Sequence, residues 1–124
     1  MKFRAAAYIL FTRDVGRLAA FYERAFGFKR KKNPHYGEAS WLELEAGRGF
    51  RLCLHRSAEA PGRVGSRQGK LVLHVADVAE ARDDLRKAGV KLGSHKRWPS
   101  GDACDGRDPD GNVFQLLGPS TLAG

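Results

Sequence analysis

Apolar and polar residues follow the same order in two stretches of the chain, which indicates an internal repeat. In each stretch a short β-type run leads to an aspartate, and a segment with apolar residues at helical spacing then runs to a glycine. The aspartates, Asp14 and Asp77, lie 63 residues apart, and the glycines, Gly27 and Gly89, lie 62 residues apart. We therefore predict two helices, each capped by an aspartate and ended by a glycine.

Short β-type runs follow each predicted helix. They cover residues 40–45, 50–55, 101–107 and 113–117, with weaker strands beginning near residues 28 and 90. This order predicts an α+β fold of two βαβββ modules in a single domain over residues 1–124. We place the first module at about 1–57, a linker rich in glycine, serine, proline and arginine at about 58–67, and the second module at about 68–124.

The segment Asp108-Pro-Asp-Gly-Asn112 lies between the last two apolar runs. Proline fixes φ, glycine and asparagine tolerate positive φ, and aspartate side chains bond to turn backbone, so the segment predicts a hairpin turn.

Composition limits the partners and the compartment. The net charge of +8 and the pI of about 9.9 favour anionic partners. The densest basic cluster, residues 29–32, is interpreted as a solvated strand end, because no stacking pattern or nucleic-acid motif accompanies it. The apolar N-terminal stretch is too short for a signal peptide, and no apolar run approaches membrane-spanning length. We therefore expect a cytoplasmic protein with Cys53 and Cys104 reduced.

Several segments spread over about residues 5–118 resemble the vicinal-oxygen-chelate superfamily, which includes glyoxalase I, extradiol dioxygenases and the fosfomycin- and bleomycin-resistance proteins. The similar segments are 11–15, 21–22, 25–28, 52–55, 74–78 and 108–116. The resemblance implies two modules that curl around a shared cleft, and for small members a homodimer. It also implies, in metal-dependent members, one ligand on the first and one on the last strand of each module.

The superfamily's four ligand positions fall here on Ala7, Cys53, Lys70 and Gln115. Alanine has no donor atom, an ammonium group has no lone pair, and none of the four is a carboxylate. We therefore predict that the usual metal is absent, and we expect no cofactor.

Strand alternation predicts which side chains face the cleft. With Trp98 added from a loop that overhangs the cleft in the resemblance, the predicted ligand-binding residues are Arg51, Cys53, His55, Lys70, His74, Trp98 and Gln115. Polar side chains among apolar walls are typical of a small-molecule site.

Several roles stay open for these residues. His55 and His74 could ligate an unusual metal with Cys53 or Gln115, or be satisfied by structural partners, and His74 could act as a general base. Lys70 could bind a substrate carboxylate or extend into solvent. Cys53 could be a nucleophile if its pKa were lowered.

The sequence thus favours a protein that binds a polar or anionic small molecule without the usual metal. The alternative is a metal-dependent lyase or dioxygenase with a displaced histidine site, so the sequence does not decide whether the protein is an enzyme. Because the chain is basic, we predict that it does not sequester cationic drugs such as bleomycin.

Overall fold

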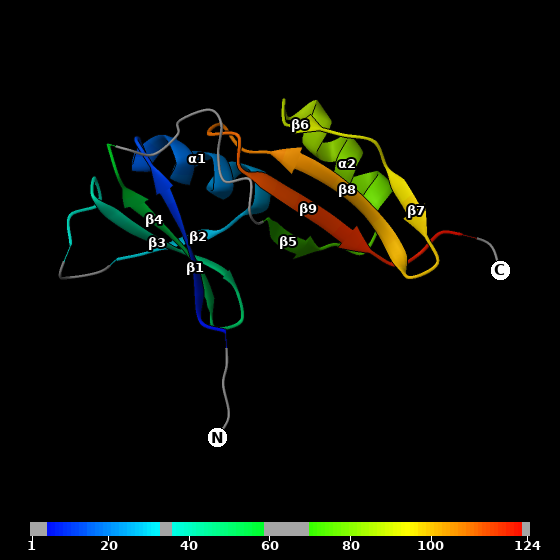
Figure 1. Ribbon diagram of the computed structural model, residues 1–124, viewed down its shortest axis with the longest axis horizontal. Helices are drawn as coiled ribbons and strands as arrows, with labels where there is room; N and C mark the ends of the chain where they lie inside the picture. Colours follow the sequence, from blue (N-terminus) through cyan, green and yellow to red (C-terminus); the bar gives the residue numbers. More distant parts are fainter. Residues whose placement is uncertain (1–4, 33–35, 59–69, 123–124) are drawn as a thin grey trace, which may run out of the picture. The chain divides into compact units, whose positions relative to one another are not determined.

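The computed structural model describes residues 5–32, 36–58 and 70–122. The chain forms two compact units, Met1–Gly62 and Arg63–Gly124 (Figure 1), and each is described by itself. The predicted α+β class is confirmed, since each unit combines one helix with one mixed sheet.

The first unit has the predicted βαβββ order. Its elements are β1 (Ala7–Thr12), α1 (Val15–Phe26), β2 (Lys29–Lys31), β3 (Trp41–Gly47) and β4 (Phe50–Arg56). The sheet order is β1-β4-β3-β2, in which β1 and β4 run parallel and the other neighbours antiparallel.

The second unit repeats this order with one more short strand. Its elements are β5 (Leu71–His74), α2 (Val78–Lys87), β6 (Lys91–Leu92), β7 (Lys96–Trp98), β8 (Gly101–Arg107) and β9 (Val113–Gly118). The sheet order is β5-β9-β8-β6, and β7 pairs with β8. Trp98 was predicted in a loop, but it ends β7 and pairs with Gly101. The cause is local, because residues 99–100 form a tight connection that lets the chain fold back on itself.

The predicted helix caps are confirmed. The Asp14 carboxylate accepts a hydrogen bond from the Arg17 backbone N–H at 3.0 Å, and Asp77 accepts one from the Glu80 N–H at 3.0 Å. Gly27 ends α1 with a left-handed φ of 70°, a conformation that glycine adopts without steric cost. The N-terminal caps are equivalent in the two halves, whereas α2 has Ala88 at its C-cap and Gly89, with a φ of 87°, follows it.

Each helix covers one face of its own sheet. In the first unit Leu18 and Tyr22 of α1 pack with alternate residues of β3 and β4, including Leu44, Leu52 and Leu54, and all five are buried. Burying such a side chain stabilises the fold by about 1.5–3 kcal/mol. Side chains at the intervening strand positions point to the other face, which we call the helix-free face. No helix among the described residues is long and apolar enough to cross a membrane.

The predicted hairpin turn joins β8 to β9. Asp108 Oδ1 accepts hydrogen bonds from the backbone N–H groups of Asp110 and Asn112, both at 2.9 Å, and Gly111 has a φ of 82°. The turn thus satisfies its own backbone with a buried aspartate, as its sequence predicts.

Candidate functional site

The helix-free face of the first sheet carries several of the predicted ligand-binding residues. Strand register sets Ile9, Cys53 and Glu43 side by side across β1, β4 and β3. The next rung holds Phe11, His55 and Trp41. The alternation predicted for Arg51, Cys53 and His55 is therefore confirmed on this sheet, although their contact with a ligand stays a prediction.

Four rings form a continuous series, which we call the aromatic row. Its members, in spatial order, are Phe11, His55, Trp41 and Tyr36. Their successive ring centroids lie 5.5, 5.6 and 6.0 Å apart. Phe11 is 56% exposed and Tyr36 is 59% exposed, so the row has apolar surface at both ends. Such rings offer large contact area at low entropic cost.

A buried carboxylate, Glu43, fixes the middle of this face. Its side-chain oxygens accept hydrogen bonds from Arg51 Nη1 at 2.8 Å and from Trp41 Nε1 at 2.9 Å, and the residue is only 7% exposed. Arg51 is therefore engaged by a carboxylate within the same sheet. Sequence reasoning missed Glu43 as a site residue, although its position two residues after Trp41 in an alternating strand places both on one face.

Cys53 lies in the middle of the same face and is 3% exposed. Burial raises the pKa of its thiol, and the negative charge of Glu43 raises it further, against a smaller lowering by Arg51. The protonated thiol is a poor nucleophile at neutral pH. This environment counts against a catalytic role for Cys53.

The helix-free face of the second sheet is less aromatic. One rung holds Val72, Gln115 and Asp105, and Lys70 precedes β5. Lys70 Nζ lies 3.1 Å from Asp105 Oδ2 and 3.3 Å from Oδ1. Lys70 thus has an intramolecular carboxylate partner. The sequence alone indicated only substrate binding or extension into solvent for this side chain. His74 occupies the next rung of this sheet, opposite Leu117.

The four superfamily ligand positions do not fit a hard divalent ion. Ala7 offers no donor, Cys53 carries a protonated thiol, and the Lys70 ammonium is paired with Asp105. Only the Gln115 carbonyl oxygen is a suitable donor. In residues 5–32, 36–58 and 70–122, no three histidine, cysteine, aspartate or glutamate side chains gather into a metal-binding group. His55 and His74 belong to different units, so their joint ligation of a metal stays a hypothesis.

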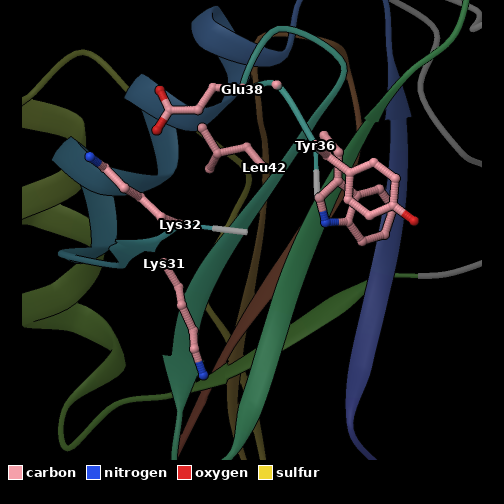
Figure 2. Close-up of a pocket in the computed structure, with 7 residues that line it drawn as sticks. Lys31, Lys32, Tyr36, Glu38 and Leu42 are labelled. Atoms are coloured by element: carbon pink, nitrogen blue, oxygen red, sulfur yellow. The ribbon is translucent and has the colours of Figure 1, made fainter. Parts of the chain in front are cut away.

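A hollow of about 600 Å³ lies at the end of the aromatic row (Figure 2). Its lining residues are Lys31, Lys32, Tyr36, Gly37, Glu38, Trp41 and Leu42. A smaller hollow of about 310 Å³ lies in the second unit between β6, β8 and β9. The larger hollow combines basic and aromatic side chains, whereas the lining of the smaller one mixes charged, aliphatic and glycine residues without an aromatic ring, so the larger hollow suits a small ligand better.

Comparisons with known proteins agree with this architecture. The family model described as a glyoxalase-like domain matches residues 7–117. The search of curated protein sequences found no match.

Among solved structures, TnmS3, an antibiotic-binding protein from Streptomyces sp. CB03234, is 27% identical with a TM-score of 0.78, over 96% of this chain and 98% of that one. The bleomycin-binding protein of Streptomyces verticillus, complexed with copper(II)-bleomycin, is 19% identical with a TM-score of 0.70, over 97% and 99% of the two chains. The fosfomycin resistance protein FosX of Listeria monocytogenes is 14% identical with a TM-score of 0.75, over 98% and 94%. At these identities the last two comparisons concern the fold alone.

Proposed function

The chain belongs to the glyoxalase-like domain family of the vicinal-oxygen-chelate superfamily, and from this premise we propose that it binds a polar or anionic small molecule and releases it unchanged. The observation that carries the proposal is the aromatic row on the first sheet. Its two exposed ends flank a histidine and an indole whose positions are fixed by neighbouring groups. Such a preformed apolar surface with a few fixed polar groups is typical of ligand sites.

The chemistry of the face supports binding more than catalysis. Glu43 accepts hydrogen bonds from Arg51 and Trp41, so its carboxylate stabilises the face and is not a free base. The pKa of the Cys53 thiol is raised, and the superfamily's metal positions lack the donors that a divalent ion needs. The antibiotic-binding description of TnmS3, at 27% identity, favours the same function class for this chain.

The other predicted ligand-binding residues keep defined places in the proposal. His55 belongs to the aromatic row, while Lys70, His74 and Gln115 form a second candidate ligand surface on their own sheet. Trp98 adds an exposed indole at the end of β7. We further propose that the protein works in the cytoplasm and that it forms a homodimer. Sedimentation at micromolar concentrations tests the homodimer directly.

The test is a binding screen with chemical analysis of the ligand. A panel of polar and anionic small molecules is titrated against the purified protein, and bound molecules are recovered and weighed by mass spectrometry. We expect stoichiometric binding, an unchanged ligand mass, and clear weakening in Phe11→Ala. Leu122→Ala, which truncates an exposed apolar residue outside both candidate ligand surfaces, is the matched control. Conversion of the ligand, or weakening by Leu122→Ala alone, would contradict the proposal.

Cationic drugs provide a second test of ligand charge. With a net charge of +8, the chain is expected to bind a bleomycin-like cation at least tenfold more weakly than an anion of similar size at low salt. Titration with copper-bleomycin in a buffer of low ionic strength checks this, and tight binding there would show that the ligand charge is assigned wrongly.

A further inference from the structure

The larger hollow exists because two neighbouring strands differ in length. The pairing of β2 with β3 covers Lys29–Lys31 on one side and Glu43–Glu45 on the other. Because β3 begins at Trp41, its first two residues extend beyond the β2 pairing, and the hollow opens beside them. Figure 2 shows the two lysines on one side of this hollow and Tyr36 on the other, with Leu42 between them.

The hollow carries uncompensated positive charge. Lys31 and Lys32 are exposed, and neither makes an ion pair with any residue that the structure describes. The nearby acid, Glu38, lies 3.5 Å from Arg30, which makes a shorter ion pair of 2.9 Å with Glu23. The cross-strand neighbour of Lys31 is Glu43, whose carboxylate is held by Arg51 and Trp41. Arg30, Lys31 and Lys32 together outnumber Glu23 and Glu38, so a net positive charge remains to attract an anion.

The opposite wall of the hollow is aromatic, and its Trp41 ring is held in place. The rings of Tyr36 and Trp41 lie 6.0 Å apart at an angle of 47°. The Trp41 indole is held by its hydrogen bond to Glu43 and by its edge contact with His55. A ring that is held before binding loses little conformational entropy when a flat ligand packs against it.

We infer that the hollow binds a planar aromatic acid, whose ring packs against Tyr36 and Trp41 while the charges of Lys31 and Lys32, whose ammonium ends point in different directions (Figure 2), attract its anionic group. This inference rests on the proposed small-molecule function and assigns the chemical class of the ligand. A volume of about 600 Å³ lies within the range of drug-sized sites. Neither the aromatic wall nor the lysines alone would select such a molecule, because the first attracts any flat ring and the second any anion.

The test compares two probes of the same shape, 2-naphthoate and the neutral 2-naphthylmethanol, by calorimetry at low salt. Against the wild type, naphthoate is expected to bind at least tenfold more tightly than the alcohol. The double variant Lys31→Gln/Lys32→Gln should weaken naphthoate about tenfold, because it removes two partly solvated attractions, and should leave the alcohol within about twofold. Lys87→Gln/Lys91→Gln removes the same net charge from exposed positions of the second unit and should change neither probe by more than about twofold.

A second variant tests the aromatic wall separately. Tyr36 is highly exposed, so Tyr36→Ala leaves the core intact and should weaken both probes by a similar factor. Equal affinity for the two probes, or a loss of naphthoate binding in both lysine pairs alike, would overturn the inference, as would absence of naphthoate binding at millimolar concentration.

These failures differ from failure of the proposed function. Suppose that panel molecules bind more weakly to Phe11→Ala while the affinity for naphthoate is unchanged by the substitutions at Lys31 and Lys32. In that case the proposed function stands and the assigned ligand class is wrong. If a bound molecule is converted chemically, the proposed function fails, whatever the lysine variants do to naphthoate.

Discussion

The two sheets place a carboxylate at the same repeat position and neutralise it in different ways. Glu43 in β3 lies opposite Cys53, and Asp105 in β8 lies opposite Gln115, the equivalent residue of the second unit. Glu43 pairs with Arg51 of β4, whereas Asp105 pairs with Lys70, which precedes β5. The Glu43 side chain is 10% exposed and that of Asp105 is 49% exposed. The repeat therefore keeps the acid position, while the partner and the depth of burial have diverged.

The neighbouring rungs have diverged further. Phe11, His55 and Trp41 of the first sheet correspond to His74, Leu117 and Ala103 of the second. One backbone arrangement thus carries an aromatic surface in one unit and a mostly aliphatic one in the other. Because the fold is shared by both sheets, our proposal of a ligand surface on the first sheet rests on its side chains and not on the fold.

The helix-covered faces differ as well, and here we expect the largest effect on stability. The first sheet pairs Leu44 with Leu52, whereas the second pairs Gly106 with Phe114, whose ring is fully buried. A Cβ atom at position 106 would overlap that ring. Gly106→Ala should therefore lower the free energy of unfolding by about 2–3 kcal/mol in urea titrations.

Two variants sharpen this test. Gly37→Ala, where a Cβ atom meets nothing within 4 Å, should change the free energy of unfolding by less than about 0.5 kcal/mol. Adding Phe114→Leu to Gly106→Ala should recover part of the loss, because the smaller side chain makes room for the methyl group. If Gly106→Ala lowered the free energy of unfolding by less than about 0.5 kcal/mol, the difference in packing between the Gly106–Phe114 and Leu44–Leu52 pairs would not be supported.

The next largest effect concerns the buried acid of the first sheet. Glu43→Gln removes the charge that holds Arg51 and Trp41 together, so the free energy of unfolding should fall by about 1–2 kcal/mol. In a double-mutant cycle with Arg51→Met, the coupling between the two residues should be about 1 kcal/mol, reduced by the partial exposure of the guanidinium. If the losses of Glu43→Gln and Arg51→Met were additive, the Glu43–Arg51 pair would contribute no more than an exposed pair such as Lys70–Asp105.

The difference between the units also explains how far the sequence could predict the structure. Helix caps, the hairpin turn at residues 108–112 and the faces of the long strands follow from short-range rules, and the structure confirms them. The short strand β7 was not predicted, because three residues carry too little periodic signal and Trp98 gains its place only by pairing with β8.

Ion-pair partners were the other limit. Alternation placed Arg51 on the helix-free face, and the equivalent argument placed Lys70, but it does not say which acid each cation meets. The Lys70 partner, Asp105, is 35 residues away in the chain, and strand order decides that contact. Glu43 was visible as an alternating residue, yet only the structure shows that it joins Arg51 to Trp41.

A pH-dependent difference between the units is expected at Asp102. In the second unit this buried residue accepts hydrogen bonds from Thr121 Oγ1 at 2.6 Å and from the Thr121 backbone N–H at 3.0 Å, and His95 Nε2 lies 2.8 Å from its carboxylate. The Thr121 hydroxyl above all, with the backbone N–H and His95, holds the pKa of Asp102 below its usual value. The corresponding position of the first unit is Ser40, which offers no acid.

The sign of the effect follows from the lowered pKa. The stabilisation by Asp102 is fully present above the unfolded pKa of about 3.9, and it is lost as the pH falls through the lower folded pKa. Melting temperatures recorded from pH 7 to pH 2.5 should therefore fall less steeply in Asp102→Asn than in the wild type. Asp83→Asn, on the exposed surface of α2, should keep the wild-type slope. If the melting temperatures of the wild type and Asp102→Asn fell equally with pH, Asp102 would not contribute to the loss of stability in acid.

The smallest effect is expected for the ion pair of the second sheet. Lys70 and Asp105 have side chains that are 43% and 49% exposed, so water and salt screen their attraction and the pairing restricts two mobile side chains. A double-mutant cycle with Lys70→Gln and Asp105→Asn should give a coupling of about 0.5 kcal/mol or less, and it should vanish in 0.5 M salt. The Glu43–Arg51 coupling should persist under the same conditions, because its carboxylate is largely shielded from water. If the Lys70–Asp105 coupling equalled that of Glu43–Arg51, burial of the carboxylate would not distinguish the ion pairs of the two sheets, and the contrast between them would be wrong.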